Sequence, residues 1–148
     1  MSLVENKKAR LDYEVLDALE AGLVLSGSEV KATRKGQADL KGSYIEVNPA
    51  GEAYLINCYI APYKPASFSQ KSYSPNQPRK LLLTKKELRF LVGKQKEKGL
   101  TIIPLEIFLK NNYLKIKIAV ARGKKKFDKR ESIKKKEFER RKQKLLND

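Results

Sequence analysis

Carboxylate side chains that could bind a metal ion gather in the first part of the chain. Paired carboxylates hold the magnesium ions of two-metal nucleases, and five acidic residues lie close together here: Asp12, Glu14, Asp17, Glu20 and Glu29. The chain has no histidine to join them, and they match no recognised acidic motif. Acidic residues at alternating positions are also typical of a half-exposed strand that binds no metal. A metal-dependent nuclease is therefore the least favoured of three functions that the sequence suggests.

Basic side chains form a more informative set. The chain carries 33 Lys and Arg against 17 Asp and Glu, a formal net charge of +16. Such a charge attracts phosphate in RNA, in DNA or on an anionic membrane surface, and the charge and its clustering favour nucleic acid. Lys and Arg bind phosphates, and rings such as Tyr44 or Tyr113 can stack on unpaired bases, although a tyrosine on a strand more often packs against its neighbours. The basic residues that stand out are Lys7, Lys8, Arg10, Lys31, Arg34, Lys35, Arg79, Lys80, Lys115 and Lys117.

Residues 122–148 carry half of the net charge, with 13 Lys and Arg against 5 Asp and Glu. They contain too few apolar side chains to offset the entropy lost on ordering, so we expect this tail to order only on a polyanion. The preceding 121 residues hold 20 basic and 12 acidic groups among enough Leu, Ile and Val for one core. The sequence therefore predicts one domain over 1–121 and a flexible basic tail over 122–148.

Absent residue types narrow the function further. Without histidine the chain lacks the usual general base near neutral pH and the commonest zinc ligand. A single cysteine, Cys58, excludes an internal disulfide and suits a reducing compartment. No signal peptide follows Met1, and no apolar run approaches the length of a membrane span. We therefore expect a cytoplasmic protein.

Two helices can be predicted from their ends. A helix over about 84–98 begins with capping-box spacing between Thr84 and Glu87 and is followed by a glycine. Ser28 is the predicted N-cap of a shorter helix that closes near Gly36.

After the longer helix, the pattern predicts strands over 100–109 and 113–120. Asn111 and Asn112 join them and tolerate positive φ, so a tight hairpin is favoured. Pro104 predicts a bulge or an edge position. In the second strand apolar and polar residues alternate, so one face should enter the core and the other should present its lysines.

A second hairpin is predicted from strands over 44–47 and 52–60, joined by a turn with a proline and a glycine. Residues 61–79 contain four prolines and should form a long surface loop, a kind of segment that is often functional.

The first 40 residues fit two patterns. Apolar residues recur with the spacing of one helix face at Leu11, Val15, Ala18 and Leu19, and this pattern alone favours a helix. The same stretch also fits two strands with a turn around Ala21-Gly22.

Eight short motifs stand out along the chain: Asn6-Lys7-Lys8-Ala9-Arg10, Leu19-Glu20-Ala21-Gly22-Leu23, Gly27-Ser28-Glu29-Val30-Lys31, Arg34-Lys35-Gly36, Arg79-Lys80-Leu81-Leu82-Leu83, Glu97-Lys98-Gly99-Leu100-Thr101, Lys115-Ile116-Lys117, and the run from Ala121 to Arg130. In this order and at about this spacing, the motifs resemble the small protein B (SmpB) family, the bacterial tmRNA-binding proteins of trans-translation. The resemblance is specific because all eight separated motifs agree.

This resemblance implies a closed antiparallel β-barrel of OB-like character with about three flanking helices, and strands in the ambiguous first segment. It implies that the protein is not an enzyme and has no catalytic residue, no metal and no cofactor. Family members bind the tRNA-like domain of tmRNA and enter stalled ribosomes with it, where the protein stands in place of an anticodon arm. Elongation factor Tu and alanyl-tRNA synthetase are implied as further partners of the same tmRNA, and the protein as a monomer without a membrane partner.

The resemblance also implies site residues. Positions that match the tmRNA-facing surface are Asn6, Glu20, Lys31, Arg34, Leu82 and Lys115, to which the basic residues Lys7, Arg10, Arg79, Lys80 and Lys117 are added. Positions in the tail that match the part reaching the decoding centre of the small ribosomal subunit are Asp128, Lys129 and Arg130, next to Lys124, Lys125 and Phe127.

The tail is expected to become helical in the empty mRNA channel. Phe127 stands where relatives often carry His or Tyr, which preserves stacking on a base but removes a side-chain hydrogen bond. The alternative function is a basic OB-type domain that binds single-stranded RNA or ribosomal RNA for another purpose.

Overall fold

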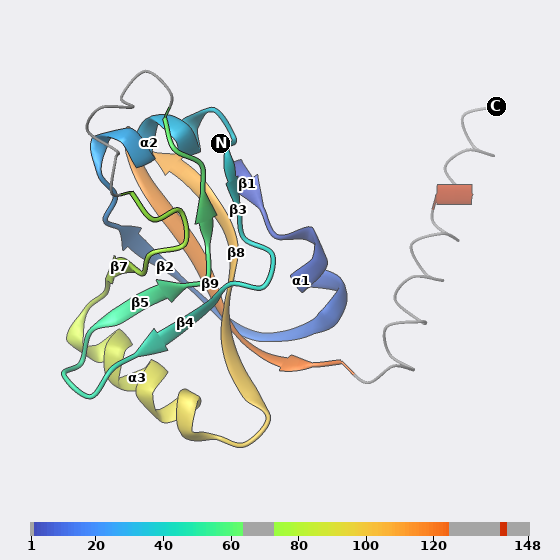
Figure 1. Ribbon diagram of the computed structural model, residues 1–148. Coiled ribbons are helices and arrows are strands. Elements are labelled where there is room, and N and C mark those ends of the chain that lie inside the picture. Colours follow the sequence, from blue (N-terminus) through green and yellow to red (C-terminus); the bar gives the residue numbers. More distant parts are fainter. Residues whose placement is uncertain (1, 64–72, 125–139, 142–148) are drawn as a thin grey trace.

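The computed structural model describes residues 2–63, 73–124 and 140–141. Within these residues the chain forms one strand-rich domain with three helices (Figure 1). The strands are β1 (Ser2–Glu5), β2 (Tyr13–Leu23), β3 (Ala38–Asp39), β4 (Tyr44–Val47), β5 (Ala53–Ile56), β6 (Tyr59–Ile60), β7 (Arg79–Leu82), β8 (Leu100–Lys110) and β9 (Tyr113–Gly123). The helices are α1 (Lys7–Asp12), α2 (Gly27–Arg34) and α3 (Lys85–Lys96).

The two longer helices begin with capping boxes. In α3 the Thr84 side chain accepts from the Glu87 N–H while the Glu87 carboxylate accepts from the Thr84 N–H, so the helix predicted over residues 84–98 is confirmed. The same reciprocal pair joins Ser26 and Glu29 at the start of α2. The predicted cap at Ser28 is therefore wrong by two residues, because Ser26 is the residue that Glu29 can reach at the spacing of a capping box.

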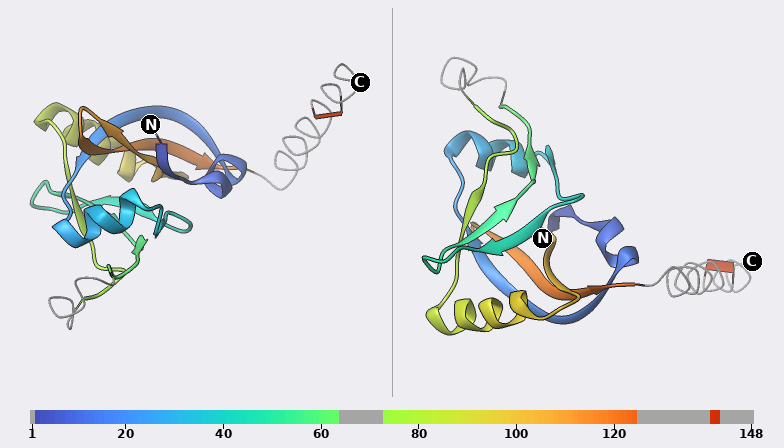
Figure 2. Two further views of the ribbon diagram at one scale, coloured as in Figure 1. Left: turned by 90° about the horizontal axis from the view of Figure 1, so that it is seen from above. Right: turned by 60° about the horizontal axis from the view of Figure 1, so that its bottom comes forward.

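The main sheet has the strand order β1-β8-β9-β2-β7-β5-β4, and every neighbouring pair is antiparallel. The sheet curls so that the long strands β2, β8 and β9 form one layer and β4 lies across the core from β8, with α3 against both (Figure 2). Fully buried side chains between the layers include Leu55, Leu91, Ile102, Ile107 and Ile116.

The β8–β9 hairpin agrees with its prediction. Asn111 and Asn112 have φ values of 52° and 65°, as a tight turn requires. The register of the pair shifts between Pro104 and Glu106, so the bulge predicted from Pro104 is confirmed.

Strand β2 replaces the helix that the apolar spacing of the first segment favours. It pairs with β9 from Tyr13 to Gly22, and this long ladder outweighs a local helical pattern. It is also one continuous strand, so the turn considered near Ala21 is absent. Its opposite edge pairs with β7 only at Gly22 and Leu23, which leaves the edge over residues 14–21 open within the described structure.

The closed barrel implied by the resemblance is wrong for this structure. The end strands β1 and β4 form no ladder with each other among the described residues. Near both end strands, side-chain amides bind backbone groups instead. Gln95 of α3 accepts from the Val47 N–H of β4 at 2.9 Å and donates to the Val47 carbonyl at 3.2 Å. Asn6, which follows β1, donates to the Pro104 carbonyl at 2.9 Å. Because β1 ends at Glu5, where the chain turns into α1, it is too short to bridge the gap.

The second predicted hairpin is partly right. Its first strand is β4, but the expected strand over residues 52–60 breaks at Asn57, whose φ of 62° no regular strand allows. Beyond the break, β6 leaves the main sheet and pairs with β3. No helix in the described part of the chain combines the length and apolar character needed to cross a bilayer.

Candidate nucleic-acid interface

The outward-facing side of the long strands brings together several of the predicted site residues. Directly opposed residues of antiparallel strands point to the same face of the sheet. One such row crosses β8, β9, β2 and β7 through the pairs Phe108↔Lys115, Lys115↔Gly22 and Gly22↔Leu82. We call this surface the outer face. It comprises Glu20, Gly22, Leu82, Glu106, Phe108, Lys110, Tyr113, Lys115 and Lys117.

A hollow of about 480 Å³ lies beside this row, between the β2–α2 connection and the tip of the β8–β9 hairpin. Gly22 forms part of its wall. A Cβ at this position would lie only 3.1 Å from the Leu82 Cβ, so a larger residue here would push Leu82 aside. Leu82 is 58% exposed and Tyr113 is 71% exposed at its rim. Large apolar and aromatic side chains left in water beside lysines can receive an unpaired base or a sugar edge.

Acidic side chains interleave with the lysines of the outer face. Glu20 accepts from the Lys110 Nζ at 3.2 Å, with both side chains about half exposed. Glu20 also lies opposite Lys117, which lies opposite Glu106 on its other side. The carboxylate of Glu20 thus holds Lys110 in place, and the strand register alternates acidic and basic positions across the face.

A second basic cluster lies on α2. Lys31 and Arg34 are exposed on this helix, as predicted. The Nζ atoms of Lys31 and Lys35 lie 5.4 and 5.1 Å from the centre of the Tyr63 ring, so two cations lie over one aromatic ring. Lys80 is also exposed, and its Nζ lies 3.3 Å from the Glu52 carboxylate.

Arg79 lies inside the protein. Only 2% of its surface is exposed, and Glu29, which is 3% exposed, faces it from α2. The guanidinium contacts Glu29 Oε2 through Nε at 2.8 Å and through Nη2 at 2.7 Å, and donates to the Cys58 carbonyl and the Tyr73 hydroxyl. Each guanidinium nitrogen has a partner inside the protein, so Arg79 is not placed to contact RNA.

The same network sets the ionisation of its members. Burial alone would raise the pKa of Glu29, but hydrogen bonds from the Ser26 N–H and from Arg79, with the Arg79 charge, hold it below its ordinary value. Burial raises the pKa of the Cys58 thiol to about 11, so this cysteine stays protonated at neutral pH. Its thiol therefore lacks the reactivity of a thiolate.

The remaining predicted residues lie at the other end of the sheet. Lys7 and Arg10 are exposed on α1, whereas Asn6 is buried and caps this helix by accepting from the Ala9 N–H at 3.2 Å. Lys124 ends the second described range, and its N–H donates to the Asp12 carbonyl at 2.8 Å. The predicted tail residues Lys125, Phe127, Asp128, Lys129 and Arg130 lie outside the described residues.

Sequence reasoning missed several contributors. Gly22 and Phe108 complete the central row of the outer face, and only the strand register shows that they adjoin Lys115. Among the described residues, Cys, Asp and Glu form no group of three or more that could hold a metal ion.

Comparisons with known proteins identify the family of this chain. The family model described as "SmpB protein" matches residues 3–148. The "SsrA-binding protein" of Sulfurihydrogenibium sp. (strain YO3AOP1) is 53% identical over 135 residues, which cover 91% of this chain and 87% of the relative. The "SsrA-binding protein" of Aquifex aeolicus (strain VF5) is 48% identical over 139 residues, with 93% and 87% covered. A chain from a solved structure described as "tmRNA-SmpB: a journey to the center of the bacterial ribosome" has a TM-score of 0.67 and 44% identity, with 90% of this chain and 95% of that chain covered.

Proposed function

Because this chain belongs to the SmpB family, we propose that it binds tmRNA and delivers it to stalled ribosomes for trans-translation. It acts by binding RNA and not as an enzyme. The observation that carries this function is the family match over residues 3–148, joined with the outer face on which Glu20, Leu82 and Lys115 meet.

The outer face suits the folded tRNA-like domain of tmRNA. Its lysines can contact phosphates, and the hollow beside Leu82 and Tyr113 provides a place for an unpaired base. The exposed basic residues Lys31, Arg34 and Lys80 extend the positive surface at its border. Paired strands fix the backbone positions of these lysines, so the face can select the shape of a folded RNA, whereas a flexible chain of lysines cannot.

A gel-shift comparison of full-length protein on tmRNA and on an elongator tRNA tests this function. We expect clear preference for tmRNA, because a fixed surface recognises the shape of one folded RNA. Equal binding of both RNAs and of unstructured RNA would support instead a general single-stranded RNA-binding protein.

Alanine substitutions of Lys115 and Leu82 should both weaken tmRNA binding, but with different effects on its salt dependence. Lys115→Ala is expected to lower the affinity and to reduce the slope of log affinity against log salt by about 0.7 to 0.9, since one phosphate contact is lost. Leu82→Ala is expected to lower the affinity with an unchanged slope, because Leu82 carries no charge. The measurement is a salt titration of tmRNA binding, with Lys96→Ala on α3 as an exposed control outside the outer face. A slope equal to wild type for Lys115→Ala would remove Lys115 from the interface.

Glu20 separates a specific role in tmRNA binding from a general effect of charge. Net charge alone predicts that removing this carboxylate strengthens tmRNA binding, whereas a specific role predicts weaker binding. Glu20→Ala raises the net positive charge, yet we expect weaker tmRNA binding, because the carboxylate orients Lys110 and can accept from a ribose 2′-hydroxyl. The matched control is Glu14→Ala, an equal change of charge near the other end of β2. Tighter binding by Glu20→Ala than by wild type, with the fold unchanged by circular dichroism, would contradict a specific role.

Several finer features belong to the same proposal. Residues 1–121 form the tmRNA-binding domain, and the basic segment 122–148 enters the decoding centre and the empty mRNA channel as a helix. There Phe127 stacks on a base while Asp128, Lys129 and Arg130 fix the position of the segment. The protein stands in place of an anticodon arm, works as a monomer in the cytoplasm, and shares its tmRNA with elongation factor Tu and alanyl-tRNA synthetase. The composition of the tail and its position in the family match support the role proposed for residues 122–148.

A further inference from the structure

The buried carboxylate of Glu29 joins parts of the chain that lie far apart in the sequence. Its Oε1 accepts from the Ser26 N–H at 3.1 Å and so belongs to the cap of α2. Its Oε2 accepts from Arg79 at the start of β7 and lies 3.2 Å from the Tyr73 hydroxyl. The Gln77 side chain donates to the same oxygen at 3.4 Å. We call Glu29, Tyr73, Gln77 and Arg79 the clamp.

The clamp also joins the two ends of the segment between β6 and β7. The Tyr73 hydroxyl accepts from Arg79 Nη2 at 2.9 Å and donates to the Ile60 carbonyl at 2.9 Å. The Ile60 N–H in turn donates to the Pro75 carbonyl at 3.0 Å. The end of β6 therefore lies beside the chain that leads back to β7, and the Tyr73 hydroxyl links both to the buried ion pair.

One end of this segment contacts the basic surface of α2. Tyr63 follows Ile60 by three residues, and its ring lies next to the Nζ atoms of Lys31 and Lys35. A lysine that an aromatic ring restrains loses less conformational freedom when it binds a phosphate than an unrestrained lysine does. The position of Tyr63 therefore bears on how well the two lysines bind RNA.

The other end of the segment leads to the hollow of the outer face. Arg79 begins β7, and Leu82, three residues later, lines the hollow. Glu29 precedes Val30, which lines the same hollow from α2. The buried pair of Glu29 and Arg79 therefore ties together two elements that shape the hollow.

We infer that Tyr73 is a positioning residue for tmRNA binding. Through the clamp it holds α2 in place relative to β7, so that Lys31 and Lys35 meet RNA phosphates at the same time as the outer face. Tyr73 acts through these residues, because its own hydroxyl is bonded to partners inside the protein. The inference rests on the proposed function and deepens it, since the eight motifs of the resemblance do not include Tyr73.

A purely structural role of the clamp leads to a different result. If the clamp only stabilises the fold, a variant that remains folded binds tmRNA with the affinity and the salt dependence of wild type. If the clamp positions the lysines of α2, the folded variant loses phosphate contacts, and the slope of log affinity against log salt decreases.

The test is a salt titration of tmRNA binding by full-length protein, at a temperature where circular dichroism shows every variant to be folded. Tyr73→Phe removes the hydroxyl and keeps the ring. Ile45→Val is the matched control, because it shortens a buried side chain of β4 that belongs neither to the clamp nor to the outer face. Gln77→Ala removes another donor of the clamp and replaces Tyr73→Phe if that variant does not fold.

Tyr73→Phe is expected to weaken tmRNA binding by about 2- to 30-fold. The salt slope should decrease by about 0.7 to 0.9 for each lysine that loses its phosphate. Ile45→Val should bind as wild type does. In a Lys31→Ala background, Tyr73→Phe should cost less affinity than it does in wild type, because one of the contacts that it positions is already gone.

An affinity and a slope equal to wild type for folded Tyr73→Phe would overturn the inference. Equal losses of affinity with and without Lys31, or the same loss in Ile45→Val, would also overturn it. Lys115→Ala tests the proposed function separately, because Lys115 lies on β9 outside the clamp. A wild-type protein that binds tmRNA no better than an elongator tRNA would remove the proposed function and the inference with it.

Discussion

Ending the chain after Phe127 is expected to abolish tagging on stalled ribosomes while leaving tmRNA binding close to that of the full-length protein. The truncation removes nine basic and five acidic residues, so the remaining chain stays strongly positive. The outer face and its hollow lie within residues 20–117 and are untouched. The measurement pairs a tmRNA gel shift with a tagging assay on ribosomes stalled on an mRNA without a stop codon.

A variant with the residues after Phe127 in scrambled order provides the matched control, since its composition and charge equal those of the wild type. If the tail fixes its position through Asp128, Lys129 and Arg130, the scrambled variant should also fail to tag. Full tagging by the scrambled variant, or an equal loss of tmRNA binding and tagging in the truncated one, would show that the tail only adds general attraction to RNA.

Glu29→Gln is expected to lower the free energy of unfolding by about 3–5 kcal/mol, although it lies outside the proposed RNA contacts. The substitution keeps the shape of the side chain but leaves the buried guanidinium of Arg79 without its counter-charge. Chemical denaturation at neutral pH measures the loss. Glu52→Gln, which breaks the exposed pair with Lys80, serves as the control and should change stability little. An equally small effect for Glu29→Gln would show that the Arg79 pair does not stabilise the fold.

The Glu29 pair also predicts how stability responds to acid. Because the folded protein holds the pKa of Glu29 below its ordinary value, the contribution is present above the unfolded pKa of about 4.3 and is lost as pH falls through the folded value. Wild type should therefore lose stability more steeply below about pH 4.3 than Glu29→Gln, which has no group to protonate there.

The local signals in this sequence predicted its local structure well. The capping box at Thr84 and the paired asparagines at residues 111 and 112 act through neighbours in the chain, and both elements formed as predicted. The helical spacing from Leu11 to Leu19 failed, because β2 gains its hydrogen bonds from β9, about a hundred residues away. The local pattern fits strands as well as a helix, and only the distant pairing partner decides between them.

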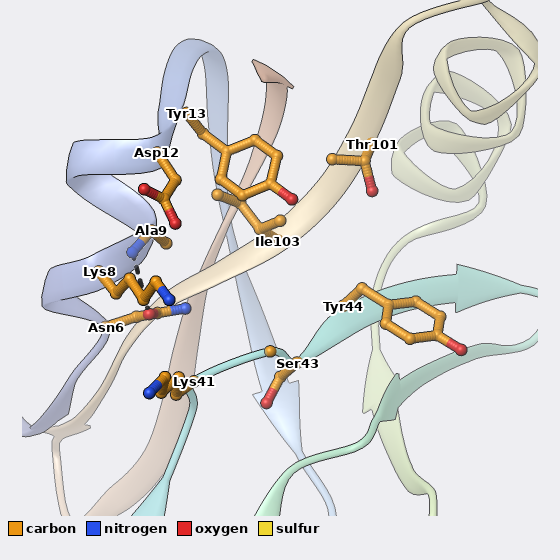
Figure 3. A pocket seen from close by; sticks show the side chains of 11 residues that line it. Asn6, Lys8, Ala9, Asp12, Tyr13, Lys41, Ser43, Tyr44, Thr101 and Ile103 are labelled. Carbon is orange, nitrogen blue, oxygen red and sulfur yellow. Dashed lines mark hydrogen bonds between the residues drawn. The ribbon is translucent and has the colours of Figure 1, made fainter. Parts of the chain in front are cut away.

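The candidate site was also predicted only in part, and the parts that were missed depend on contacts between distant residues. The resemblance supplied Glu20, Leu82 and Lys115, which the structure places on one face. Composition alone counted Arg79 among the RNA contacts, since nothing in the sequence reveals that Glu29 faces it in the interior. The cavity between α1, the start of β2, β4 and β8 (Figure 3) escaped prediction, because its lining residues lie far apart in the sequence and meet only in the fold.

The open edge of β2 also bears on how the protein behaves in concentrated solution. An unpaired strand edge over residues 14–21 could accept a strand from another copy and begin an aggregate. Glu14, Asp17 and Glu20 place charge along this edge, and the register shift between Val15 and Asp17 bends it away from the straight geometry that a new strand would need. Two copies would also have to bring their net charges of +16 together. The edge is therefore protected against self-association, and the unbound protein should stay dispersed at concentrations where an uncharged, regular edge would form fibrils.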